Sequence, residues 1–99
     1  MLFAALARSL LDSGHEVHIV TAVGHRRKHT VAADVDATGV PATTVKVLIF
    51  DHPRQAPVLK RDYCLAEGIQ LFIDDRLDTC RVLRDSGVLS LNILKGGGG

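Results

Sequence analysis

The sequence lacks a long apolar run, a marked excess of either charge, and cysteine spacing of the zinc-binding kind. Its 99 residues carry 12 Lys and Arg against 11 Asp and Glu, for a net charge of +1, which favours neither a nucleic-acid coat nor a disordered tail. The apolar residues 1–11 are interrupted by Arg8 and Ser9, and this segment is far too short to span a bilayer. It also lacks the basic start and cleavage site of a secretory leader. We therefore expect a cytoplasmic protein with no membrane partner and no clear nucleic-acid binding.

The chain has two cysteines, Cys64 and Cys80. Both fall in segments with a helical pattern, and without a leader or zinc-type spacing they are expected to be free thiols in a reducing compartment. Ninety-nine residues leave no room for a second core, so we expect a single domain over residues 1–95. Residues 96–99 are all glycine and are expected to form a flexible tail outside the fold.

Hydrophobic spacing predicts helices that alternate with short strands. Apolar residues recur at helical spacing in several segments that end near a glycine, whereas the β-branched and apolar runs between them are of strand length. The predicted helices cover residues 1–11, 25–38, 57–67 and 77–86. The predicted strands cover residues 17–20, 45–50, 70–73 and 88–94.

The strand at residues 45–50 is almost continuously apolar, which predicts that both of its faces are covered, as in a parallel sheet. Strands that alternate with helices over short connections are typical of a parallel, right-handed α/β architecture. In such a fold the functional site lies beyond the carboxyl ends of the strands.

Several polar residues follow the predicted strands and are therefore expected along one rim of the sheet. They are Thr21, then Asp51 and His52, then Asp74 and Asp75, with Lys60 joining them from the helix before the third strand. A hydroxyl, a lysine and a group of carboxylates suit a phosphate and Mg²⁺ site, because the first two hold phosphoryl oxygens and carboxylate oxygens are ligands for a hard cation.

With these residues in place, the chain resembles the haloacid dehalogenase (HAD)-like hydrolase superfamily, in particular its phosphatases without an inserted cap. The sequence HIVTA at residues 18–22 is similar to the second motif of that superfamily, with Thr21 as the phosphate-binding hydroxyl. The sequence APVLKRDYC at residues 56–64 is similar to the third motif, with Lys60 as the lysine that steadies the transferring phosphoryl group.

The sequence LFIDDR at residues 71–76 is similar to the fourth motif, with Asp74 and Asp75 as Mg²⁺ ligands and Asp78 as an alternative ligand. The resemblance implies a Rossmann-like three-layer fold with a parallel sheet. It also implies a Mg²⁺-dependent phosphomonoester hydrolase, with a phosphorylated small molecule or a nucleotide as its partner. Thr21 and Lys60 are then the catalytic residues.

The chain departs from this pattern at the first motif, a central strand ending in D-x-D whose first aspartate is the nucleophile. Asp34 and Asp36 match that spacing, but alanines precede them and no crossover helix fits before the strand at residues 45–50, so we expect a helix end there. A sheet missing its central first strand also exposes unpaired edges, which favour self-association. The chain is thus expected to be an inactive, N-terminally truncated phosphatase domain.

Other readings of the same residues stay open. Asp74 and Asp75 are also compatible with caps of the following helix, although two adjacent carboxylates exceed what capping needs. Thr21 alone is compatible with a turn hydroxyl, and Lys60 with a solvated side chain. A non-catalytic regulatory domain would keep the Mg²⁺ and phosphate site without turnover. The start of the chain is also compatible with a nucleotide-sugar transferase, although FIDDR at residues 72–76 after a lysine-bearing helix argues against it.

Overall fold

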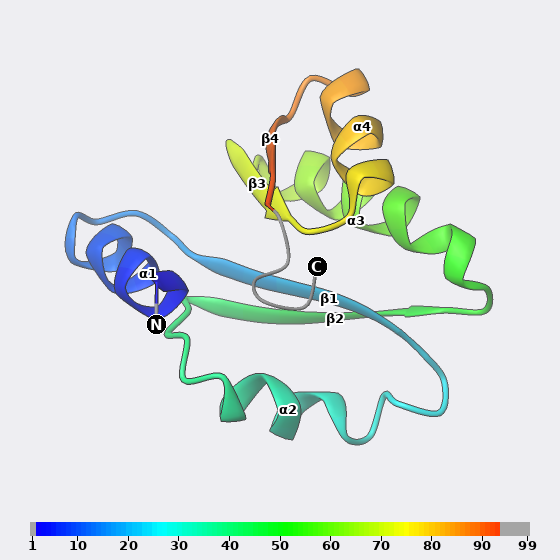
Figure 1. Ribbon diagram of the computed structural model, residues 1–99, viewed down its shortest axis with the longest axis horizontal. Helices are drawn as coiled ribbons and strands as arrows, with labels where there is room; N and C mark the ends of the chain where they lie inside the picture. The colour runs from blue at the N-terminus through cyan, green and yellow to red at the C-terminus, as the bar shows by residue number, and fades with distance from the viewer. Residues whose placement is uncertain (1, 94–99) are drawn as a thin grey trace. The chain divides into compact units, whose positions relative to one another are not determined.

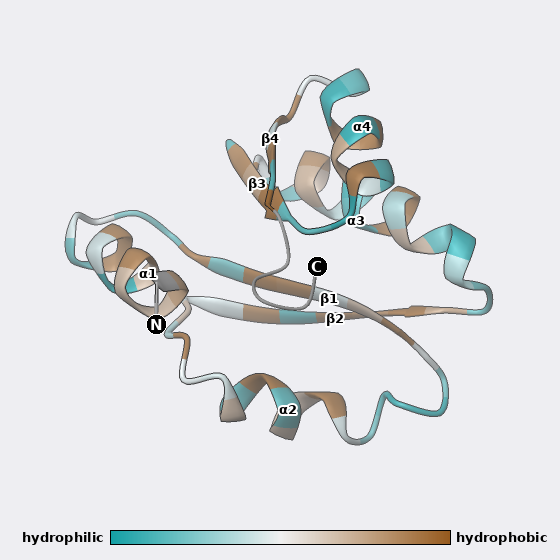
Figure 2. Cartoon of the chain, in the orientation of Figure 1, coloured by the Kyte–Doolittle hydropathy of each residue, from teal (hydrophilic) through white to brown (hydrophobic). Residues whose placement is uncertain are grey.

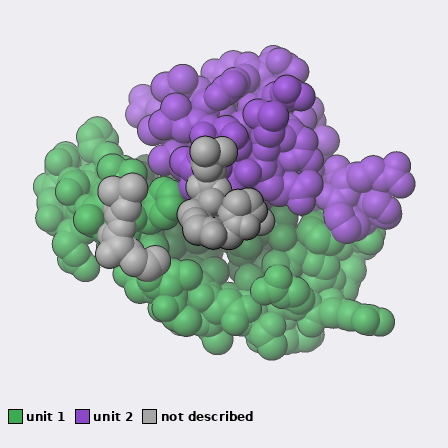
Figure 3. Space-filling model, viewed as in Figure 1, with its two compact units in different colours: residues 1–51 green, residues 52–99 purple. Residues whose placement is uncertain are grey.

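Helices alternate with parallel strands along the chain, which confirms the α/β class predicted from the sequence. The structure is a computed structural model and describes residues 2–93. The chain divides into two compact units, residues 1–51 and residues 52–99 (Figure 3). Unit 1 contains helix α1 (Leu2–Asp12), strand β1 (His18–Gly24), helix α2 (Val31–Ala37) and strand β2 (Thr44–Phe50) (Figure 1). Unit 2 contains the 3-10 helix η1 (Pro53–Gln55), helix α3 (Ala56–Glu67), strand β3 (Leu71–Asp74), helix α4 (Leu77–Asp85) and strand β4 (Leu89–Asn92).

The strands pair in parallel within each unit. In unit 1, β1 and β2 pair from His18 with Thr44 to Gly24 with Phe50. In unit 2, β3 and β4 pair from Leu71 with Leu89 to Asp74 with Asn92. Parallel neighbours require a crossover connection, and the segments that contain α2 and α4 supply it. Within residues 2–93 the strands form two separate two-stranded sheets.

The core of unit 2 lies where α3 and α4 cover one face of the β3–β4 sheet. Its buried apolar residues are Cys64, Phe72, Leu83 and Val88, with Ile69 packed against them. On α4 the fully buried positions are Thr79, Cys80 and Leu83, whose spacing of three and four residues places them on one side of the helix. The helix is thus fixed to the sheet by a single buried stripe.

The opposite face of the β3–β4 sheet is apolar and exposed. Leu71, Leu89 and Leu91 are 44%, 64% and 48% exposed, and they alternate with the buried Phe72 and Ser90 because neighbouring strand residues point to opposite faces. Unit 2 therefore has one covered and one exposed sheet face.

The prediction that both faces of the strand at residues 45–50 are covered is wrong. In β2, Val45 and Ile49 are 46% and 36% exposed, and Lys46 is exposed as well. The apolar residues of β2 lie in a strand that pairs with β1, and among them Val47 and Leu48 are half-buried. An apolar run alone cannot distinguish a strand covered on two faces from one covered on one face.

The segment after β1 differs from the predicted helix at residues 25–38. Residues 25–30 form turns, and α2 begins only at Val31. The amide of Arg27 donates to the carbonyl of Gly24 at 3.1 Å and the amide of Thr30 donates to the carbonyl of Arg27 at 3.1 Å, so successive tight turns use the backbone groups. The segment is hydrophilic (Figure 2) and has no apolar face that would favour a helix.

The strand predicted at residues 17–20 continues to Gly24, whereas the helices and strands of unit 2 begin and end close to the predicted residues. Helix α3 ends at Gly68, whose φ of 66° places it in the left-handed region that glycine enters without steric cost. The predicted last strand is observed as β4, while its expected end at Leu94 and the glycine tail at residues 96–99 lie outside the described residues. In the part of the chain that the structure describes, helices are too short or too polar to cross a membrane.

Burial of Cys64 makes the stability of the protein sensitive to high pH. Removal from water raises the pKa of this thiol from 9.0 to about 11, with the charge of Lys60 acting in the opposite direction. A group whose pKa is higher in the folded than in the unfolded state stabilises the fold at pH values below its unfolded-state pKa. This stabilisation is lost as the pH rises through the folded-state pKa. We expect the stability advantage of the native protein over Cys64→Ala to fall by about 2 kcal/mol between roughly pH 8 and 11. Urea unfolding at several pH values measures this, and parallel pH profiles for the two proteins would contradict it.

Candidate functional site

An ion pair between Lys60 and Asp74 forms the centre of the candidate site. Asp74 is the last residue of β3, and Lys60 lies in the first half of α3. The Lys60 Nζ is 2.9 Å from the Asp74 Oδ2, and the side chains are only 13% and 8% exposed. The sequence predicted that these two residues share one rim of the sheet, and the structure confirms that they touch.

The other polar atoms of Asp74 are also engaged. Its Oδ1 accepts a hydrogen bond from the backbone amide of Arg76 at 2.9 Å. Its carbonyl oxygen accepts from the amide of Ile93 at 3.0 Å and from the Nδ2 of Asn92 at 3.4 Å. The carboxylate is therefore held by Lys60 of α3 and by the amide that precedes α4, while the end of β4 bonds the backbone carbonyl of the same residue.

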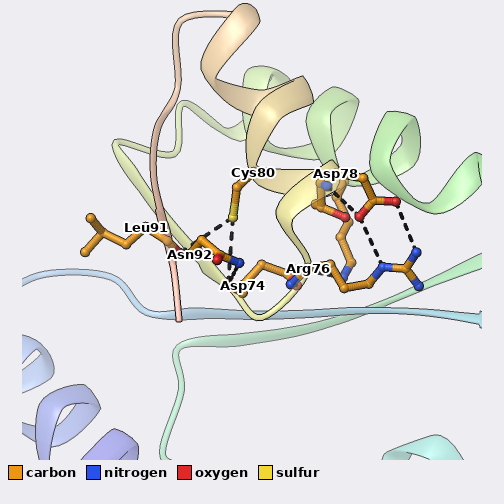
Figure 4. Close-up of polar contacts among 8 residues, drawn as sticks. Asp74, Arg76, Asp78, Cys80, Leu91 and Asn92 are labelled. Atoms are coloured by element: carbon orange, nitrogen blue, oxygen red, sulfur yellow. Dashed lines mark hydrogen bonds and ion pairs between the residues drawn. The ribbon is translucent and has the colours of Figure 1, made fainter. Parts of the chain in front are cut away.

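Cys80, on α4, contacts the ends of both β3 and β4. Its Sγ lies 3.7 Å from the carbonyl oxygen of Asp74 and 3.6 Å from that of Leu91, and Figure 4 shows the sulfur pointing towards both strand ends. Burial raises the pKa of the Cys80 thiol, with the charge of Asp74 adding to the effect. The protonated thiol has one hydrogen to donate, which these two carbonyl oxygens share.

Asp78 forms a separate pair with Arg76 at the start of α4. The Nε and Nη2 of Arg76 donate to Asp78 Oδ1 and Oδ2 at 3.2 and 3.0 Å, and the amide of Thr79 donates to Oδ1 at 2.8 Å (Figure 4). The hydrogen bonds from Arg76 lower the pKa of Asp78 and raise that of Arg76. Both side chains are more than half exposed, so the pair adds little stability.

The alternative role of Asp74 as a cap of α4 is not observed, because the residue that precedes this helix has no side-chain cap hydrogen bond. Asp74 accepts from the amide of Arg76, the residue that precedes α4, and Asp78 accepts from the amide of Thr79 within its first turn. The carboxylate of Asp74 instead pairs with Lys60. The arrangement is thus not explained by helix capping.

The carboxylates offer the donor chemistry of Mg²⁺ but not a preformed cage. Among residues 2–93, no three His, Cys, Asp or Glu side chains are grouped so as to hold a metal ion. Mg²⁺ usually keeps several waters and binds one or two protein carboxylates together with phosphate oxygens. In this structure both carboxylate oxygens of Asp74 are engaged, by Lys60 and by the amide of Arg76. The assignment of Asp74, Asp75 and Asp78 as metal ligands stays a prediction.

Thr21 is placed differently from the sequence prediction. It lies in the middle of β1, in register with Val47, because the strand continues through the buried Val23 to Gly24. It belongs to unit 1, whereas Lys60 and Asp74 belong to unit 2. The expectation that Thr21 follows the strand end is wrong, and its phosphate-binding role stays a prediction.

Two further contacts concern residues on the predicted rim. His25 Nε2 lies 2.7 Å from Asp51 Oδ1 in unit 1, and both side chains are exposed. His52 instead accepts a hydrogen bond from the amide of Arg54 and caps η1. Neither contact involves Lys60 or Asp74.

Sequence reasoning missed the residues that hold Asp74 in place, namely Arg76, Cys80 and Asn92. The signal for Asn92 was available, because it ends β4 opposite Asp74 and so occupies the same kind of strand-end position. Nothing in the sequence indicated the sulfur contacts of Cys80, since its distance from the two strand ends depends on how α4 packs.

Comparisons of the chain with family models, with curated proteins and with solved structures find no match.

Proposed function

We propose that the chain is a Mg²⁺- and phosphate-binding domain of the HAD-like phosphatase type, with a Rossmann-like arrangement of its parallel strands. The observation that carries this proposal is the largely buried pair of Lys60 and Asp74 at 2.9 Å. A lysine and a carboxylate held together at the carboxyl end of a parallel strand combine an anion-binding and a cation-binding group at one point.

The roles of the residues follow from their chemistry. The ammonium of Lys60 has three donors and would hold phosphoryl oxygens. Asp74 and Asp75 would bind the metal, with Asp78 near the same helix start. Bound Mg²⁺ would neutralise charge on the phosphoryl group.

Turnover of a phosphomonoester would also require a nucleophilic aspartate. Asp34 and Asp36 match the spacing of the nucleophile motif, but they lie in α2, where Asp34 pairs with Arg27 at 3.1 Å. A helix does not present them at a strand end. This observation favours the second candidate, a non-catalytic binding or regulatory domain, and the two candidates differ only in turnover.

Calorimetric titration of the full chain with Mg²⁺ tests the proposal. We expect one saturable site that weakens at least about tenfold in Asp74→Asn and Asp75→Asn, because each loses a charged ligand. Asp62→Asn is the matched control, since Asp62 is an exposed carboxylate on α3 paired with Arg61, and it should bind as the native protein does.

Asp75 is exposed, so its replacement removes no buried side chain. Unchanged Mg²⁺ binding in Asp74→Asn and Asp75→Asn, or no binding to the native chain, would overturn the proposal. Hydrolysis of a generic aryl phosphate separates the two candidates: its absence favours the binding domain, and activity that depends on Asp74 favours the phosphatase.

A further inference from the structure

We infer that the chain pairs with a second copy of itself through the outer edge of strand β3, so that the two-stranded β3–β4 sheets of both copies join edge to edge. The inference concerns unit 2 alone and does not rest on the proposed function. It follows from which backbone groups of β3 face β4 and which face away from it.

Alternate residues of β3 direct their backbone groups towards β4. The carbonyl oxygen of Asp74 accepts from the amide of Ile93 at 3.0 Å, so the backbone of Asp74 faces β4. Because neighbouring strand residues direct their N–H and C=O groups to opposite sides, Phe72 also faces β4, whereas Leu71 and Ile73 face away from it. Among residues 2–93, β3 pairs with no strand other than β4, so the outward groups have no strand partner.

The outer edge of β4 is occupied by a side chain. Ser90 lies three residues before Ile93, so its backbone faces away from β3. The Nε and Nη2 of Arg84 on α4 donate to the carbonyl oxygen of Ser90 at 3.1 and 2.9 Å. Charged side chains and prolines at an edge strand prevent pairing with another chain, and residues 71–73 of β3 contain neither. Within its described residues, unit 2 therefore offers the edge of β3 for pairing.

A second copy fits this edge because the edge is complementary to itself in the antiparallel direction. When Phe72 lies opposite Phe72 of the second copy, Leu71 of each chain lies opposite Ile73 of the other. These are the residues whose backbone groups face outwards, and each such pair exchanges two hydrogen bonds. The arrangement has a two-fold axis, so the interface is isologous and the assembly closes as a dimer.

The side chains favour the same register. Leu71 and Ile73 lie on the exposed face of the sheet, where apolar pairs across two strands add stability. Asp74 of each chain lies opposite the uncharged Gln70 of the other. Registers centred nearer the carboxyl end of β3 bring Asp74 and Asp75 of the two copies towards each other, and like charges across a strand pair are destabilising.

Analytical ultracentrifugation of the full chain, at concentrations from micromolar to millimolar, tests the association. We expect a monomer–dimer equilibrium that weakens at least about tenfold in Leu71→Pro, because each copy loses one outward amide and the interface thus loses two hydrogen bonds. Leu71 is the first residue of β3, a position that tolerates proline, and its amide does not face β4.

Leu89→Lys is the matched control. Leu89 is 64% exposed on the same sheet face, but it lies on β4 and not at the free edge. Its replacement should change dimerisation much less than Leu71→Pro does. A dimer in which the exposed faces stack on each other would instead lose most in Leu89→Lys, which would overturn the inference.

Disulfide formation tests the register. A mixture of Leu71→Cys and Ile73→Cys chains should form a mixed cross-linked dimer under oxidising conditions, because these positions lie opposite each other between copies, with Cα atoms about 5.5 Å apart. Each variant alone should cross-link much less, since the same position in the two copies is about 7 to 8 Å apart. The native Cys64 and Cys80 are buried and stay in every sample.

A native chain that remains monomeric at all concentrations would overturn the inference, as would Leu71→Pro chains that dimerise like the native chain. Preferential cross-linking of either cysteine variant with itself would contradict the antiparallel register. If Leu71→Pro does not fold, the mixed cross-link decides, because both cysteine variants keep their backbone amides. Absence of that cross-link would then overturn the inference.

Discussion

Replacement of Lys60 by methionine is expected to lower the free energy of unfolding by about 3 to 5 kcal/mol, because it leaves a largely buried carboxylate without its counter-ion. Asp74 is 8% exposed and Lys60 is 13% exposed, so water does not replace the lost partner. The amide of Arg76 still donates to the Asp74 Oδ1, but it carries no compensating charge. Urea unfolding at neutral pH measures the loss.

A double variant and a surface control show whether the loss comes from the unpaired charge. Lys60→Met with Asp74→Leu removes both charges and should recover much of the stability, since a buried ion pair replaced by apolar groups is often near neutral. Arg61→Met breaks the more exposed pair with Asp62 and should cost less than about 1 kcal/mol. Equal losses in Lys60→Met and Arg61→Met would show that the Lys60–Asp74 pair is not an effectively buried one.

The part of the candidate site that the sequence predicted is the part that follows from local rules. Asp74 ends a short apolar strand and Lys60 lies in the preceding helix, so the order of strand and helix alone brings them to one end of the sheet. Hydrophobic spacing likewise predicted the helices and strands of unit 2, because it is a local property of the sequence. The contact between Asp74 and Lys60 at 2.9 Å was not predicted, because it depends on how α3 packs on the sheet.

The errors in the prediction arise where a boundary depends on pairing rather than on pattern. Thr21 was expected after its strand, but pairing of β1 with β2 continues as far as Gly24 and Phe50. A strand end is set by the length of its partner as well as by its own residues. Exposure of Val45 and Ile49 was also missed, because the sequence does not say which face another element covers.

The exposed sheet face of unit 2 bears on the predicted self-association. Parallel sheets are normally covered on both faces, yet Leu71, Leu89 and Leu91 are among the most exposed large apolar residues described. Two-stranded sheets also leave strand edges that can pair with another chain. Self-association through those edges stays a prediction, and the apolar face gives it a second physical basis.

Replacement of Leu83 by alanine is expected to cost about 2 to 5 kcal/mol of stability, because it removes a buried branched side chain and leaves a cavity. Leu83 is 0% exposed and packs in one cluster with Cys64, Phe72 and Val88. The cluster joins α3, α4 and the β3–β4 sheet, so the loss weakens every contact that orients α4. A small domain has a total stability of only about 5 to 15 kcal/mol, and the variant is therefore expected to be near its unfolding threshold.

Leu77→Ala provides the matched control, because it truncates the same residue type on the same helix where the side chain is 46% exposed. Its cost should stay within about 1 kcal/mol, since substitutions on the surface usually change stability little. Chemical denaturation of both variants measures the difference. The same packing holds Cys80 against the carbonyl oxygens of Asp74 and Leu91, so Leu83→Ala, and not Leu77→Ala, should also loosen the contacts of Cys80 with the ends of β3 and β4. Similar stability losses in the two variants would mean that α4 does not pack through the buried stripe that contains Leu83.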